Sequence, residues 1–176
     1  MGSIGAGFGF TCASCGEYHV GMPSFGWDWP VQYLLVPEAE RARRVELGPD
    51  YCVIDGEWFF VRGCLEVPVR GHDEPLSWGA WVSLSGENFQ RYAELHDDVA
   101  REPGARFVGW LCSIIPGYPE TQELVAALHV RPWPTRPFIE LQPTDHPLAV
   151  EQREGITPAR VQEIAEHVMH PPPHTA

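Results

Sequence analysis

The chain has 176 residues, of which 44% are apolar and 11% aromatic. This length fits one hydrophobic core, and the composition excludes the weakly hydrophobic, highly charged class of disordered chains. Twelve basic residues, all arginine, oppose 24 acidic ones, and the net charge of −12 disfavours nucleic-acid binding through phosphate groups. There is no apolar run of membrane-spanning length and no signal peptide, so a cytoplasmic protein without membrane contact is expected.

The N-terminal half is predicted to contain a turn-rich knuckle, one helix and a hairpin. Residues 1–9 are glycine-rich and are predicted to be flexible, and residues 10–29 are too rich in Cys, Gly, Pro and aromatic residues for a regular helix. A helix is expected from Pro37, with acidic residues near its N-terminus, to Gly48-Pro49. Residues 51–55 and 58–69 are predicted to pair around the turn Asp55-Gly56, and Gly63 is interpreted as a bulge.

The C-terminal half is predicted to contain four strands, two long helices and one short helix. Strands are expected at Leu76–Leu84, 107–115, 124–130 and Phe138–Leu141, and a helix capped by Ser85 between the first two. The clearest helix has Thr157 as N-cap, Pro158 at its first position and Val161, Ile164, Ala165 and Val168 on one face. The expected fold is a single α+β domain of residues 10–170, with a mostly antiparallel twisted sheet flanked by helices and a flexible tail at residues 171–176.

The strongest signal for chemistry is Cys12-x-x-Cys15, with Gly16 directly after it. Two thiolates at this spacing can bind one tetrahedral ion, while N–H groups of the turn point toward the sulfurs. Five cysteines without an export signal argue against a disulfide framework. A structural site needs four ligands and no second Cys-x-x-Cys occurs, so the other ligands must come from His19 nearby or from a distant residue such as Cys52, Cys64, Cys112, His72 or His129. Cys52 is preferred because it lies at the head of a predicted strand, where the end of a sheet can meet the knuckle. The sequence therefore predicts zinc bound by Cys12, Cys15, His19 and Cys52.

Two alternatives compete with the metal site. A redox Cys-x-x-Cys normally lies where a strand runs into a helix, and the residues after Cys15 are poor helix formers. Both thiols can also be small buried hydrophobic groups, as is expected for Cys64 and Cys112 within apolar strands. His96 is expected to be a packed histidine on the apolar face of its helix.

A second group of residues is compatible with catalysis or with helix capping. Asp145 and His146 are adjacent, and with Glu151 they can orient an imidazole for acid/base hydrolysis or bind a catalytic metal. Capping is the preferred interpretation, because Thr144 or Asp145 is a natural N-cap for a short helix that has Pro147 just inside its start and Gly155 just past its end.

The order of several segments resembles a known bacterial family. The segments are CASCGEYH, DYCVIDGEWFFVRGCLEVPV, WGAWVSLSGENF, FVGWLCSIIPGYPET and RPFIELQPTDHPLAVEQREGIT. They are similar to the bacterial domain of unknown function DUF2199 over nearly the whole chain, which implies a bacterial cytoplasmic domain without an assigned activity. The residues that match the family's pattern are Cys12, Cys15, Cys52, Arg62, Gly63, Trp78, Trp81, Asp145, His146, Glu151 and Gln152.

Three functional hypotheses follow from these observations. The preferred one is a zinc-stabilised binding or interaction module whose negative charge steers it to a basic protein partner. The others are a hydrolase-like enzyme that uses Asp145, His146 and Glu151, and a thiol redox protein that uses Cys12 and Cys15. The substrate or partner and the oligomeric state stay open.

Overall fold

The computed structural model describes residues 7–171, which contain ten strands and five helices. Residues 1–6 and 172–176, parts of the segments predicted to be flexible, lie outside this range. The elements are β1 (Gly9–Thr11), β2 (Tyr18–Val20), β3 (Ser24–Gly26), α1 (Val31–Leu35), α2 (Glu38–Arg44), β4 (Val45–Leu47), β5 (Tyr51–Ile54), β6 (Trp58–Val67), β7 (Leu76–Leu84), α3 (Gly86–His96), β8 (Arg106–Leu111), β9 (Val125–His129), β10 (Phe138–Leu141), α4 (Pro147–Glu154) and α5 (Pro158–Met169). No helix in the described range has the length and apolarity needed to cross a membrane.

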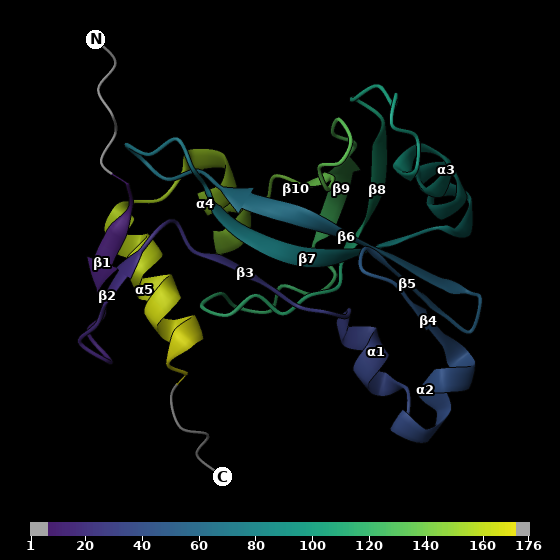
Figure 1. The fold of residues 1–176 in the computed structure, drawn as a ribbon, viewed down its shortest axis with the longest axis horizontal. Helices are drawn as coiled ribbons and strands as arrows, with labels where there is room; N and C mark the ends of the chain where they lie inside the picture. Colours follow the sequence, from purple (N-terminus) through teal and green to yellow (C-terminus); the bar gives the residue numbers. More distant parts are fainter. Residues whose placement is uncertain (1–6, 172–176) are drawn as a thin grey trace.

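Five consecutive strands, β6 to β10, close into a barrel (Figure 1). Each strand pairs antiparallel with the next, and β10 returns to pair with β6. An odd number of strands in up-and-down order leaves the first and the last pointing the same way, so the closing pair is parallel, with Phe138 opposite Cys64. The α+β class is confirmed, but the mostly antiparallel twisted sheet of the sequence prediction is corrected to a sheet that closes into a barrel, which removes most sheet edges.

Three further strands extend the barrel through its longest hairpin, β6/β7. The strand β3 pairs parallel with the first residues of β7, and β5 pairs antiparallel with the first residues of β6 and carries β4 on its other side. In Figure 1 the β1/β2 hairpin and α5 lie at one end of the molecule, whereas α3, α2 and β4 lie at the other. The surface formed by the β1/β2 hairpin and α5 is therefore separate from the surface formed by α3, α2 and β4.

Gly63 is where the barrel closes, and the predicted bulge is absent. The register between β6 and β7 runs without interruption, with Gly63 opposite Ala80. A Cβ at Gly63 would lie 2.9 Å from the carbonyl oxygen of Pro137 and 2.9 Å from Cγ1 of Ile139. The missing side chain therefore allows β10 to approach β6.

The main core takes residues from all five barrel strands and from α3, α4 and α5. Burial alternates along the strands, as in β8, where Phe107 and Leu111 are buried and Val108 and Trp110 are exposed. A second, smaller cluster lies around the fully buried Trp81. Its other members are Val36, Cys52, Ile54, Phe60 and Cys112.

The helix signals are confirmed at two N-termini and corrected at one C-terminus. Ser85 accepts a hydrogen bond from the N–H of Asn88, and Thr157 accepts one from the N–H of Arg160, so both are N-caps. The helix expected to reach Gly48 ends at Arg44, because Val45 pairs with Ile54 as the start of β4. Tertiary strand pairing thus replaces the last predicted helical turn.

The turn between β5 and β6 confirms the predicted hairpin and gives a pH-dependent prediction. Asp55 and Gly56 both have positive φ, 55° and 68°. The guanidinium of Arg44 donates to both carboxylate oxygens of Asp55, at 2.8 and 2.6 Å, and these bonds hold the pKa of Asp55 below its ordinary value. A carboxyl with a lowered pKa contributes stability above its unfolded pKa and loses it as the pH falls.

We therefore expect Asp55→Asn, which tolerates the positive φ, to lower the urea midpoint at about pH 7 and to match the wild type below about pH 3. Urea titrations at the two pH values measure this difference. An equal deficit at both pH values would mean that the ion pair contributes nothing and that the loss comes from the turn.

Candidate metal centre

The first potential ligands are presented by the short β1/β2 hairpin. The strands pair from Gly9 opposite Val20 to Thr11 opposite Tyr18, and the residues between them form the knuckle. The N–H of Cys12 donates to the carbonyl of Glu17 at 2.8 Å, and the N–H of Gly16 donates to the carbonyl of Cys12 at 2.9 Å. Gly16 has a φ of 75°, which allows the tight turn that places both cysteines at the hairpin tip.

Two histidines complete a group of four donors with these cysteines. One ligand atom from each of Cys12, Cys15, His19 and His170 lies within 4.8 Å of all the others. The Cys15 Sγ and the His19 Nε2 are 3.5 Å apart, close to the roughly 3.6 Å between sulfur and nitrogen ligands of a tetrahedral zinc ion. The group can therefore hold a metal ion, and it is the single such cluster of three or more His, Cys, Asp or Glu side chains in residues 7–171.

Helix α5 brings His170 to the knuckle through two side-chain contacts. The Oε1 of Glu166 accepts the N–H of Ala13 at 2.6 Å, and the Nε2 of Gln162 donates to the carbonyl of Thr11 at 3.1 Å. Gln162 also donates to Glu166 at 2.9 Å. Figure 1 shows α5 beside the β1/β2 hairpin, with its C-terminal end near the hairpin tip. These contacts place His170, the C-cap residue of α5, beside the cysteines.

Hydrogen bonds at the knuckle favour the thiolate form of one cysteine. Burial raises the pKa of Cys12, but the N–H groups of Cys15 and Ser14 and the Cys15 thiol lower it more, so that it lies below its ordinary value. The N–H of Glu17 lowers the pKa of Cys15, yet burial and the neighbouring Cys12 sulfur leave it raised. A thiolate is the form that binds metal, so the Cys12 sulfur is suited to ligation.

Cys52 lies outside this cluster, which corrects the predicted ligand set. Its side chain is 0% exposed on β5 and packs in the smaller core cluster with Phe60 and Trp81. Burial raises the pKa of Cys52 to about 12, so its thiol is protonated at neutral pH. His170 takes the fourth place, and the only sequence signal for it is a histidine directly after the last residue of an amphipathic helix.

Two of the three residues proposed for hydrolysis, His146 and Glu151, have structural partners. His146, and not Thr144 or Asp145, is the N-cap of α4: its Nδ1 accepts the N–H of Leu148 at 3.2 Å, and its Nε2 lies 3.1 Å from the carbonyl oxygen of Glu120. Both ring nitrogens are thereby engaged with the backbone. Asp145 is exposed in the connection before α4.

Glu151, on α4, is held in an ion pair with Arg160 of α5. Its Oε1 lies 3.0 Å from the Nε of Arg160, and its Oε2 accepts the hydroxyl of Tyr118. Gln152, the next residue of α4, accepts the N–H of Leu141 at 2.8 Å and donates to the carbonyl of Ile139 at 2.7 Å. Helix capping, an ion pair and strand anchoring therefore engage His146, Glu151 and Gln152, respectively.

The comparison with protein-family models identifies a family for this chain. The model of a family described as "Uncharacterized protein conserved in bacteria (DUF2199)" matches residues 11–156. Neither the curated proteins nor the solved structures contain a significant match. Cys12, Cys15 and His19 lie within the matched range, whereas His170 lies beyond it.

Proposed function

The chain belongs to the DUF2199 family of uncharacterised bacterial proteins, and we propose that it is an interaction module stabilised by a structural zinc ion. The observation that carries the zinc part is the convergence of Cys12, Cys15, His19 and His170 within 4.8 Å. Two thiolates and two imidazoles form a common zinc ligand set, and softer donors of this kind select zinc over magnesium or calcium.

A four-ligand site of this kind is structural rather than catalytic. A catalytic zinc ion keeps one coordination position for water or substrate, whereas here the protein supplies all four. The ion would join the β1/β2 hairpin to the end of α5, two segments that otherwise meet through hydrogen bonds such as Ala13 to Glu166. Zinc binding therefore contributes directly to the folding free energy of this end of the molecule.

The interaction part of the proposal rests on charge and on exposed apolar side chains. The chain carries a net charge of −12, which attracts basic proteins and raises their association rate. At the zinc end, Tyr18 is 66% exposed and Val20 is 80% exposed on β2. Large exposed apolar side chains beside a rigid element are typical of binding surfaces. We propose a basic protein as the partner.

Elemental analysis and affinity capture test the two parts separately. The purified chain should contain about one zinc ion per molecule, and no comparable amount of iron or copper. Zinc-loaded protein should capture the same partner from a host lysate in repeated experiments, and chelated protein should capture less of it. Capture should also weaken as salt is added, because the attraction is screened. Metal-free protein with native stability contradicts the zinc site, and the lack of any reproducible partner contradicts the module.

A further inference from the structure

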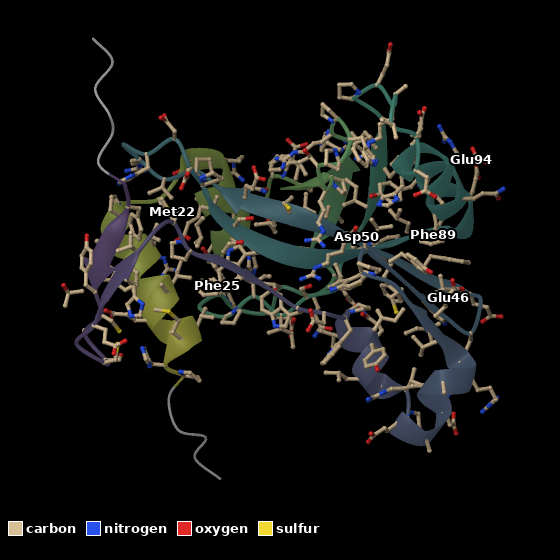
Figure 2. All side chains as sticks on the ribbon, viewed as in Figure 1. Met22, Phe25, Glu46, Asp50, Phe89 and Glu94 are labelled. Atoms are coloured by element: carbon tan, nitrogen blue, oxygen red, sulfur yellow. The ribbon has the colours of Figure 1, made fainter. Side chains whose placement is uncertain are left out.

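A cavity of about 400 Å³ lies between α3 and the turn from β4 to β5, at the end of the molecule opposite the metal cluster. Its volume is within the range of small-ligand sites. Three carboxylates and three aromatic rings share its lining: Glu46, Asp50, Asp97, Tyr51, Phe89 and Tyr92. Figure 2 shows Glu46, Asp50 and Phe89 gathered in this region, with Glu94 farther out on α3.

Tyr92 offers the cavity an unpaired polar group. It is only 4% exposed, and within residues 7–171 its hydroxyl makes no hydrogen bond. Buried hydroxyls are nearly always hydrogen-bonded in folded proteins, so this oxygen is suited to a bound group.

The charges around the cavity favour a cation. Glu46 accepts the hydroxyl of Tyr51 at 2.8 Å, and Asp50 accepts the Nε of Arg136 at 2.6 Å. A carboxylate can accept about four hydrogen bonds, so both keep acceptor capacity. With Asp97 the lining has three carboxylates and one imidazole, that of His96, which lies 2.9 Å from Asp97 and 3.8 Å from Asp50. The guanidinium groups of Arg136 and Arg101 act on Tyr92 from outside the lining, so the three carboxylates outnumber the two arginines. The aromatic rings add further attraction for a cation.

We infer that this cavity binds the ammonium or guanidinium group of a basic side chain, with the aliphatic stem packed on Phe89 and Ala93 and the charged end near Glu46, Asp50 and the Tyr92 hydroxyl. The inference rests on the proposed function in one respect, namely that the side chain comes from a protein partner. Free alkylamines have the same chemistry, and the test distinguishes them.

The test is an NMR titration of the zinc-loaded full chain with three probes: the blocked peptide Gly-Lys-Gly, the same peptide with an acetylated lysine, and n-butylammonium chloride. The lysine peptide should shift the amide signals of Tyr51, Ala93 and His96, and the acetylated peptide should not. Glu46→Gln and Tyr92→Phe should each weaken binding about three- to tenfold, which corresponds to one lost hydrogen bond or charge contact. Glu94→Gln removes the same charge outside the cavity and should bind like the wild type.

Several outcomes decide the inference. Equal affinity for the acetylated peptide, or equal weakening by Glu94→Gln, overturns it, because binding would then not depend on the cavity's charge. If n-butylammonium binds more tightly than the lysine peptide, the cavity is a cation site, but its assignment to a protein partner is overturned. None of these variants lies near the metal cluster, so zinc content should stay unchanged. A chain that binds the lysine peptide but contains no zinc contradicts the proposed function alone.

Discussion

Cys12→Ser is expected to abolish zinc binding and to lower the free energy of unfolding by about 4 kcal/mol, with free zinc at about 1,000 times the wild-type dissociation constant. Cys12 is 1% exposed and is the innermost of the four donors, so its sulfur has no replacement in the cluster. Without the ion, the β1/β2 hairpin and the end of α5 lose the metal coordination that joins them. Metal analysis together with urea unfolding in buffered zinc measures both effects.

Two histidines on the same helix end provide the matched comparison. His170→Gln should lose zinc because His170 belongs to the cluster, whereas His167→Gln should keep it, since His167 is exposed and lies outside the cluster. Cys52→Ala should also keep zinc, although it leaves a cavity in the smaller core cluster. Zinc retained by His170→Gln and lost by Cys52→Ala would restore the ligand set expected from the sequence.

Gly109→Ala is expected to cost at least about 3 kcal/mol of stability, because the new methyl group cannot be accommodated. A Cβ at this position would lie 1.8 Å from the carbonyl oxygen of Ser83 on β7. Gly109 is next to Trp110, which pairs with Ser83 where β8 joins β7. Since the clash is with backbone, relief requires the two strands to separate and the barrel to open. Urea unfolding followed by tryptophan fluorescence gives the change in midpoint.

Gly86→Ala is the control for this variant. Its Cβ would approach the flexible ring of Phe59 at 3.2 Å, and alanine is favoured at the start of α3 by helix propensity. Its stability should therefore stay within about 1 kcal/mol of the wild type. A wild-type midpoint for Gly109→Ala would show that β7 and β8 are not held at this distance in solution.

Elements with strong local signals could be predicted from the sequence. Helix α5 begins where the Thr157 cap and Pro158 place it, and β10 has the predicted bounds, Phe138–Leu141. Caps, proline positions and turn pairs such as Asp55-Gly56 act over a few residues, so they can be recognised without the rest of the fold. The short strands β1, β2 and β3 have no such pattern, and they were therefore predicted only as a block of turns.

Elements whose position depends on distant partners could not be predicted in this way. Barrel closure requires β10 to reach β6, and the glycine that allows it, Gly63, is indistinguishable in sequence from a bulge. His146 became a cap instead of Thr144 or Asp145 because its second ring nitrogen meets the carbonyl of Glu120, a residue from another connection. Such contacts depend on packing rather than on spacing.

For the candidate metal centre, the sequence by itself determined the three members that are local. Cys12, Cys15 and His19 lie within one hairpin, where chain connectivity alone keeps their side chains close. The choice of His170 over Cys52 as the fourth donor was decided only by the tertiary structure. Side chains alternate between the two faces of β5, and Cys52 lies on the face that packs in the smaller core cluster. Gln162 and Glu166 hold α5 against the knuckle through hydrogen bonds. Long-range ligands are chosen by which surfaces pack together, and that packing minimises the free energy of the whole chain.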